Sequence, residues 1–210
     1  MSGSLKVGVL GGSGNAGSQL VKHLSSKGVE VIAVARNSAK IPQLPRVTPD
    51  AGDAKNVEDV GEKLKGIDVL ASALFFDVSV DEILKIAEIS GAKRIVVVGG
   101  AGSLEASEGG PLLVDTPQFP DEFKEIARQG VKFLDDWRKV TDVDWVLVSP
   151  PIIISNDVPA TGKYRTGKDV LLTDEKGNSQ ISYDDFSLAV ADEIIDQQHS
   201  KGRFTVIEDK

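Results

Sequence analysis

The chain contains no cysteine among its 210 residues and only two histidines, His23 and His199. The lack of cysteine excludes disulfides, thiol nucleophiles and thiolate metal sites together. The two histidines fall in separate predicted helices, where surface positions explain them better than metal ligation, so we expect no metal site. No apolar run approaches the roughly 18 residues that span a bilayer, and the first predicted strand begins too close to Met1 to leave room for a signal peptide. We therefore expect a cytoplasmic protein without a membrane partner.

Positive charge is also scarce. The chain has 24 Lys and Arg against 32 Asp and Glu, which gives a formal net charge of −8, and no run of basic residues interrupts this balance. The acidic excess argues against a nucleic-acid partner. The hydrophobic share of 40% and the charged share of 27% are ordinary for a globular protein. The length suffices for one α/β domain with a full core.

Strand-like and helix-like patterns alternate along the chain, which predicts an α/β fold. We expect a Rossmann-type, doubly wound parallel sheet with helices on both faces and a small C-terminal region on the substrate side. No linker, repeat or low-complexity tract interrupts the pattern, so we expect one domain over residues 1–210. The expected strands are 5–10, 30–35, 67–73, 93–98, 145–148 and 203–207, and the later expected helices are 57–65, 81–90, 121–140 and 183–198.

Two stretches break this alternation. A loop with Pro42, Pro45 and Pro49 follows the second strand, and a third strand is expected to end near Asp53. Residues 99–120 are rich in glycine and proline, which predicts a long loop. After the strand at 145–148, the chain is expected to be irregular until residue 183.

Glycines cluster directly after the first strand. Gly11, Gly14 and Gly17 give the spacing G-x-x-G-x-x-G, while Gly12, Gly14 and Gly17 give G-x-G-x-x-G. Glycine lets the backbone come close to a phosphate, and the start of the following helix offers unpaired N–H groups with a favourable dipole. A place between the strand and the helix of an opening βαβ unit predicts dinucleotide binding, with a structural turn that holds no ligand as the alternative. The missing Gly-Lys-Ser/Thr ending excludes a P-loop.

Arg36 follows the second strand, where sites that prefer NAD usually carry Asp or Glu on the ribose hydroxyls. A guanidinium is a good bidentate phosphate ligand, so Arg36 favours NADP(H), with NAD(H) still open and a solvated arginine as the alternative. Asp53 is placed to accept from the adenine amino group, while the Ala54 backbone meets the ring. The competing role of Asp53 is to cap the helix at 57–65, for which Asn56 is better placed.

Small residues close the fourth strand, where a dinucleotide must pass. Ser72, Ala73 and Leu74 stand there, followed by Phe75 and Phe76. Either phenylalanine is a candidate to pack on the dinucleotide, and a core position explains each of them equally well.

With these residues the chain resembles the atypical short-chain dehydrogenase/reductases. It is most similar to the bacterial NADH-flavin reductase family, near the NmrA-like proteins and biliverdin reductase B. The resemblance covers nearly the whole chain and is specific for fold and cofactor but not for substrate. Its motifs are Gly11/Gly14/Gly17, Arg36, Asp53, the Gly99–Gly100 turn, residues 97–104, Ser149–Pro150, and residues 162–169 and 181–185.

The resemblance implies that NAD(P)H reduces a flavin, a quinone or a similar conjugated acceptor. It also implies a role for individual residues along the cofactor. Gly11, Ser13, Gly14, Asn15 and Ala16 would hold the pyrophosphate, Arg36 and Asn37 would meet the adenosine 2′ side, Asp53 and Ala54 would flank adenine, Ser72, Ala73 and Leu74 would meet the ribose, and Gly99, Pro150 and Ile152 would border the nicotinamide.

The proton donor of ordinary carbonyl reductases is missing. Reductases of this fold that act on ketones place Tyr-x-x-x-Lys on the helix after the fifth strand, where the lysine also holds the ribose. That helix contains Lys132, a candidate for this contact with the cofactor, but Arg128 stands four residues earlier. Ser103 is only a candidate for the hydroxyl expected after the fifth strand. Tyr164 and Lys168 match the spacing but follow the sixth strand, so we interpret the match as accidental and leave the catalytic residues unassigned.

These observations favour an NAD(P)H-dependent reductase of a flavin, quinone or related compound, because such an acceptor spreads charge over its own rings. The alternative is an NmrA-like sensor, which binds the nicotinamide nucleotide and regulates a partner without turnover. We expect a small-molecule electron acceptor as partner, and a monomer or a homodimer. Residues 103–120 and 152–182 are expected to form the substrate side, with 103–120 a candidate lid over the nicotinamide.

Overall fold

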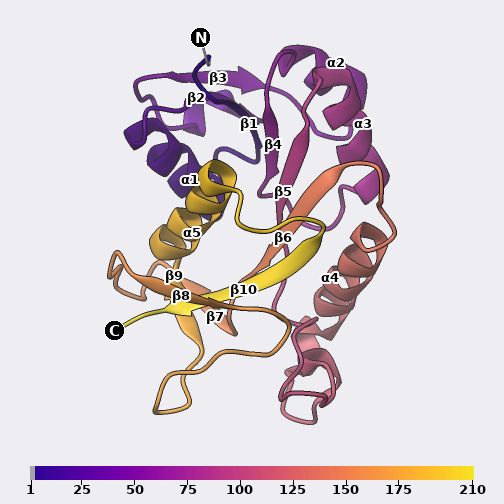
Figure 1. Ribbon diagram of the computed structural model, residues 1–210, viewed down its shortest axis with the longest axis vertical. Helices are drawn as coiled ribbons and strands as arrows, with labels where there is room; N and C mark the ends of the chain where they lie inside the picture. Colours follow the sequence, from indigo (N-terminus) through magenta and orange to yellow (C-terminus); the bar gives the residue numbers. More distant parts are fainter. Residues whose placement is uncertain (1–2) are drawn as a thin grey trace.

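A computed structural model describes residues 3–210, which are built around a central sheet (Figure 1). The strands of this sheet are β1 (Lys6–Leu10), β2 (Glu30–Ala35), β3 (Val47–Ala51), β4 (Val69–Ser72), β5 (Arg94–Val98), β6 (Asp144–Ser149), β8 (Tyr164–Gly167) and β10 (Gly202–Glu208), and β7 (Ile153–Ser155) and β9 (Gln180–Ser182) pair separately. The order is β3-β2-β1-β4-β5-β6-β10-β8, and every neighbouring pair is parallel except β10 with β8. The strand order reverses beside β1, which creates the crevice where open α/β sheets bind ligands.

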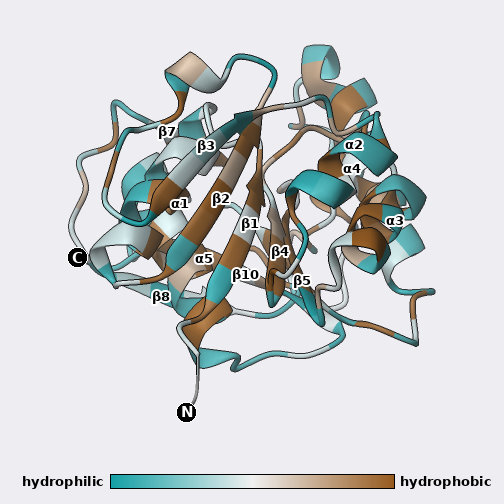
Figure 2. Ribbon diagram, turned by 90° about the horizontal axis from the view of Figure 1, so that it is seen from above, coloured by the Kyte–Doolittle hydropathy of each residue, from teal (hydrophilic) through white to brown (hydrophobic). Residues whose placement is uncertain are grey.

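Helices cover both faces of this sheet (Figure 2). One face carries α1 (Asn15–Ser26) and α5 (Tyr183–Asp196), and the other carries α2 (Val57–Lys63), α3 (Val80–Ser90) and α4 (Lys124–Trp137). The short 3-10 turns are η1 (Ser38–Lys40), η2 (Leu113–Asp115) and η3 (Asp121–Phe123). This arrangement confirms the predicted Rossmann-type, doubly wound α/β fold. Within residues 3–210, no helix is long and apolar enough to cross a membrane.

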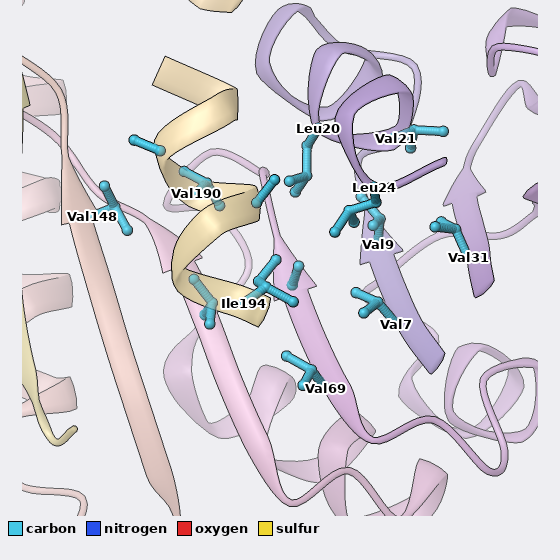
Figure 3. Close-up of a cluster of buried hydrophobic side chains, with 14 of the residues drawn as sticks. Val7, Val9, Leu20, Val21, Leu24, Val31, Val69, Val148, Val190 and Ile194 are labelled. Atoms are coloured by element: carbon cyan, nitrogen blue, oxygen red, sulfur yellow. The ribbon is translucent and has the colours of Figure 1, made fainter. Parts of the chain in front are cut away.

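An apolar layer lies on each side of the sheet. On one side, Val9 of β1 shares a cluster with Leu24 of α1 and Ile194 of α5 (Figure 3). On the other side, Trp137 of α4 and Trp145 of β6 are both buried, with ring centroids 5.7 Å apart. Burial on both faces explains why the central strands are nearly continuous apolar runs.

Side-chain caps fix the starts of α2 and α3. At α3, Ser79 Oγ accepts from Glu82 N at 3.2 Å, and the Glu82 carboxylate accepts from Ser79 N at 2.7 Å, which completes a capping box. At α2, Asn56 Oδ1 accepts from Asp59 N at 3.4 Å. Asn56 therefore caps α2, as predicted, and leaves Asp53 available for another role.

The structure departs from the predicted elements in two places. Pro49, expected in a loop, lies within β3. Because β3 is an edge strand paired only with β2, a proline there removes no hydrogen bond that the sheet needs. Residues 152–182, expected to be irregular, contain β7, β8 and β9. Strands of three or four residues give too few alternations for a periodic signal.

Candidate cofactor site

The glycine-rich turn joins β1 to α1 at the carboxyl edge of the sheet. Gly11 N and Gly12 N both donate to the carbonyl oxygen of Val34 in β2, at 3.0 and 3.1 Å, and Gly14 N donates to Gly11 O at 3.1 Å. The turn is therefore fixed to the neighbouring strand and folded back on itself, before any ligand is considered.

The glycines of this turn meet different requirements. Gly11 has φ +79°, the left-handed region that side chains rarely adopt. A Cβ on Gly17 would lie 1.9 Å from the Gly11 carbonyl oxygen, so α1 approaches this closely only with glycine there. A Cβ on Gly14 would meet only that same oxygen, at 3.6 Å. The fold thus requires glycine at 11 and 17, while Gly14 borders open space where a ligand can approach the backbone.

The first turn of α1 is open to an anion. Its N-cap is Gly14, and no side chain among residues 3–210 caps it or adds an acidic charge to the first turn. Ser18 N is the first amide with an acceptor inside the helix, Gly14 O at 2.9 Å. The amides of residues 15–17 therefore have no backbone acceptor within residues 3–210 and, supported by the helix dipole, are able to donate to a ligand. This donor set fits a pyrophosphate, and half-buried Ser13 lies on the same turn.

Arg36 lies at the carboxyl end of β2, one strand away from the glycine turn. Its side chain is exposed, and within the described part of the chain its guanidinium has no carboxylate partner. Asn37 beside it is fixed by the start of η1, where its Oδ1 accepts from Ala39 N at 3.2 Å. An unpaired guanidinium at this place is able to bind a phosphate through two parallel hydrogen bonds.

Asp53 lies after β3, farther along the same edge. Its Oδ1 accepts from Lys55 N at 3.0 Å, and its carbonyl oxygen accepts from Asn56 N at 2.8 Å, so Asp53 shapes the turn into α2. The Asp53 side chain is exposed and Ala54 behind it is buried. A carboxylate has about four acceptor positions, so Asp53 keeps capacity to accept from a ligand amine.

The end of β4 lies against the glycine turn on its other side. Ala73 N donates to Leu10 O at 3.0 Å. A Cβ on Gly11 would lie 2.9 Å from Ala73 O and 3.0 Å from Leu74 Cδ2. Ser72 is buried within the strand. The residues predicted to meet the ribose are thus directly beside those predicted to hold the pyrophosphate.

The two phenylalanines after β4 have opposite environments. Phe75 is 75% exposed. Phe76 packs on Phe133 of α4 with ring centroids 5.3 Å apart and joins the core on that side. Phe76 thus packs against the core, whereas Phe75 is the more exposed of the two and is better placed to contact a ligand.

Gly99, Pro150 and Ile152 follow β5 and β6 at the far end of the crevice. Gly99 N donates to Val148 O at 2.8 Å, and a Cβ on Gly99 would lie 2.3 Å from Leu147 Cδ2. Close packing therefore requires glycine there. Pro150 is buried, whereas Ile152 is 53% exposed. The predicted nicotinamide end combines a tight backbone with an exposed apolar side chain.

Asn156 lies beside the cofactor turn, a placement that the sequence did not indicate. Its Nδ2 donates to Asn15 Oδ1 at 3.4 Å and so connects the segment after β7 to the first residue of α1. The two residues are 141 positions apart, and a single polar contact over that separation leaves no periodic pattern. The contact places the segment that follows β7 beside the cofactor turn.

Ser103 and Lys132, the candidates for a catalytic hydroxyl and a cofactor contact, both form bonds to other residues of the protein. Ser103 is buried, and its Oγ accepts from Arg203 Nη1 at 3.0 Å, so its hydroxyl is part of a structural network. Lys132 is exposed on α4 and pairs with Asp136. It borders a hollow of about 350 Å³ that none of the strand-end candidates lines. The structure therefore does not bring Lys132 together with the other predicted cofactor residues.

Tyr164 and Lys168, which match Tyr-x-x-x-Lys in spacing, do not share a helix face, as predicted. Tyr164 begins β8, where residues four apart are separated by roughly 13 Å rather than stacked on a helix face. Its hydroxyl donates to Asp192 Oδ2 at 2.7 Å. Burial raises the pKa of Tyr164, and Asp192 raises it further, so the phenol is held protonated.

The loop between β5 and α4 is packed onto the body of the protein. Leu104 and Val114 are buried, Leu113 N donates to Leu104 O at 2.7 Å, and Glu105 N donates to Asp169 O at 2.8 Å. A lid must detach from the surface beneath it, and this segment would expose core residues if it did. The packing contradicts the lid expected from the sequence and makes residues 103–115 a fixed wall.

Known proteins share this fold. Residues 11–197 match a family model described as NAD(P)H-binding. The chain is 34% identical to the uncharacterized Bacillus subtilis protein YwnB, over 97% of this chain and 98% of that one. It is 31% identical to a Bacteroides thetaiotaomicron "putative epimerase", with a TM-score of 0.91 and 99% of both chains covered. It is 32% identical to a Streptococcus pneumoniae "putative NADH-flavin reductase", with a TM-score of 0.86 over 98% of this chain and 100% of that one.

The fold and the open phosphate turn define a Rossmann-type nucleotide-binding protein. The chain belongs to this NAD(P)H-binding family, and its structural relatives are consistent with the resemblance to atypical short-chain dehydrogenase/reductases. The names of those relatives include both an epimerase and a reductase, so family membership establishes the class of cofactor but leaves the reaction to be argued from the site.

Proposed function

We propose that this protein is an NADPH-dependent reductase that transfers a hydride to a conjugated acceptor, such as a flavin or a quinone. The observation that carries the proposal is the pairing of the uncapped start of α1 with the unpaired guanidinium of Arg36 one strand away. The first suits a pyrophosphate, and the second suits the extra phosphate that distinguishes NADPH from NADH.

We divide the site into two halves. The cofactor half consists of residues 11–17, Arg36 and Asp53, and the acceptor half consists of Phe75, Gly99, Pro150 and Ile152. In the cofactor half, the free amides of α1 would hold the pyrophosphate and Asp53 would accept from adenine. NADPH, when bound, supplies the hydride, so the work of the protein is to orient it and to exclude water.

The acceptor half supports a conjugated acceptor in two ways. Phe75 and Ile152 are exposed apolar side chains beside the strand ends, where a flat apolar ring system would cover them. The helix after β5 carries Arg128 in place of the tyrosine that ketone reduction uses, and Tyr164 is engaged by Asp192. An acceptor that delocalises the incoming charge does not depend on such a proton donor, whereas a ketone does.

The test is to follow NADPH absorbance while a panel of flavins, quinones and simple aldehydes is added to the protein. We expect NADPH to be consumed with a flavin or quinone and not with the aldehydes. Turnover of aldehydes alone would contradict the proposal. Tight NADPH binding without turnover on any acceptor would also contradict it, and would favour the alternative of a sensor of nicotinamide redox state.

A further inference from the structure

Arg203 is a buried charge that the proposed chemistry does not use. It lies near the start of β10, and its side chain is only 2% exposed. Its Nε and Nη2 donate to Asp169 Oδ1 at 3.1 and 2.9 Å. Its Nη1 donates to the hydroxyls of Ser103 and Ser149 at 3.0 and 3.1 Å, and its Nη2 also donates to the Ser103 carbonyl at 3.2 Å. Every N–H donor of the guanidinium thus has an acceptor.

The three acceptors of Arg203 belong to three different segments. Ser149 is the last residue of β6 and directly precedes Pro150. Ser103 lies four positions after Gly99, at the start of the packed wall 103–115. Asp169 follows β8, the neighbour of β10. All three segments converge on one guanidinium, although they are far apart along the chain.

Further bonds extend this junction. Glu105 N donates to Asp169 O at 2.8 Å, and Leu171 N donates to Glu105 O at 2.9 Å, so the wall is tied to the segment that Asp169 begins. Thr205 Oγ1 donates to Ser149 O at 2.9 Å, which fixes the end of β6 to β10 a second time. In Figure 1, β10 lies between β6 and β8, where it is able to reach each of these segments. No hydrogen bond of Arg203 within residues 3–210 reaches the cofactor half.

We infer that Arg203 is a positioning residue for the acceptor half: it fixes the end of β6 and the wall relative to each other, and so sets where the acceptor sits against the nicotinamide. The inference rests on the proposed function. A lysine cannot replace the fork, because one ammonium cannot reach two serines and a carboxylate in this planar arrangement. Loss of the Arg203 bonds would displace the acceptor half slightly, and small displacements of reacting groups strongly reduce the rate of hydride transfer. Nucleotide binding in the cofactor half would be unchanged.

The chain offers a matched control in Arg94. Arg94 is also a buried arginine, bonded to Asp144 and Glu193 and donating to His199 O at 2.9 Å. These groups lie at the opposite end of the sheet, because Arg94 and Asp144 are the first residues of β5 and β6. Removing Arg203 takes the donor from the buried Ser103 and Ser149 hydroxyls, and removing Arg94 takes the cationic partner from buried Glu193, which keeps its bonds to His199; both changes lower stability. Only Arg203 has acceptors beside the acceptor half.

The experiment compares Arg203→Lys, Arg203→Met and Ser149→Ala with Arg94→Met. For each variant, kcat and KM for the acceptor are measured with saturating NADPH, together with the Kd for NADPH and the melting temperature. We expect kcat/KM for the acceptor to fall about tenfold in Ser149→Ala and Arg203→Lys and about a hundredfold in Arg203→Met, mainly through kcat, with the NADPH Kd changed less than about twofold. Arg94→Met should lose stability and keep its acceptor kinetics.

The outcomes separate this inference from the proposed function. If the wild-type protein reduces no acceptor, the proposed function fails and the inference falls with it. If the wild type turns over and Ser149→Ala and Arg203→Lys keep wild-type kinetics, the inference alone is overturned. Equal losses in Arg94→Met and the Arg203 variants, or a matching loss of NADPH affinity, would also overturn it, because they indicate a general loss of structure. Should Arg203→Met fail to fold, the two milder variants decide the matter.

Discussion

Replacing Gly14 with alanine should separate ligand binding from folding. A Cβ there meets only the Gly11 carbonyl oxygen, at 3.6 Å, and the φ of −77° and ψ of 176° are allowed for alanine. Alanine is a poorer N-cap than glycine by about 0.5–1 kcal/mol. It also removes about 0.4–1 kcal/mol of unfolded-state entropy, which stabilises the protein. The two effects nearly cancel, so the melting temperature should change by no more than about 2 °C.

Gly17→Ala is the contrasting variant. Its Cβ would lie 1.9 Å from the Gly11 carbonyl oxygen, so the turn must move by roughly 1.5 Å to restore ordinary contact, at a cost of about 1–3 kcal/mol. We expect this variant to lose both stability and cofactor binding. Gly14→Ala should lose binding alone, because its methyl group occupies the space where the pyrophosphate approaches the α1 amides.

Thermal melting and titration with NADPH measure both effects in the same samples. If Gly14→Ala binds NADPH like the wild type, the pyrophosphate does not occupy the open space beside Gly14, and the proposed phosphate site is wrong. If Gly14→Ala melts at as low a temperature as Gly17→Ala, the turn requires glycine at both positions for folding, and the contrast drawn between them is wrong.

Three further variants test other parts of the site. Phe75→Ala should leave the melting temperature unchanged, because the ring is exposed, and should raise the acceptor KM; an unchanged KM would remove Phe75 from the acceptor half. Lys132→Ala should leave the NADPH Kd unchanged, and a weakened Kd would return Lys132 to the cofactor site. Tyr164→Phe should leave turnover unchanged, so a loss of turnover would show that the Tyr-x-x-x-Lys match is functional. Burial and Asp192 raise the folded pKa of Tyr164, so its stabilising contribution is present below pH about 10 and is lost as the pH rises further through the folded pKa. Denaturant titrations at alkaline pH should show a smaller loss in the phenylalanine variant.

The sequence predicted those parts of the fold that rest on local patterns. The β-branched run of β5 and the glycine turn after β1 each act within a few residues, and the parallel sheet follows from their alternation. The position of Pro49 in a strand was not predictable, because a proline is tolerated there only through the edge position of β3, which only the assembled sheet reveals.

The parts of the site that were missed depend on contacts between distant residues. Arg203 meets Ser103 across 100 positions, and Asn156 meets Asn15 across 141. Neither pair leaves a periodic or motif-like trace. The same reason explains why Phe75 and Phe76 were indistinguishable in the sequence: their roles diverge only because Phe133 of α4 packs on one of them.

The proposed function requires that NADPH lies across the sheet with its extra phosphate bound to Arg36. The test is calorimetric titration of NADPH and NADH into the wild type, Arg36→Gln and the control Arg46→Gln; Arg46 is also exposed but precedes β3, at the amino-terminal ends of the strands. A charge-assisted pair worth about 1.5–3 kcal/mol predicts that the wild type and Arg46→Gln bind NADPH about 10- to 100-fold more tightly than NADH, and that Arg36→Gln loses this difference. No heat with either nucleotide, or equal affinities in the wild type, would contradict the account.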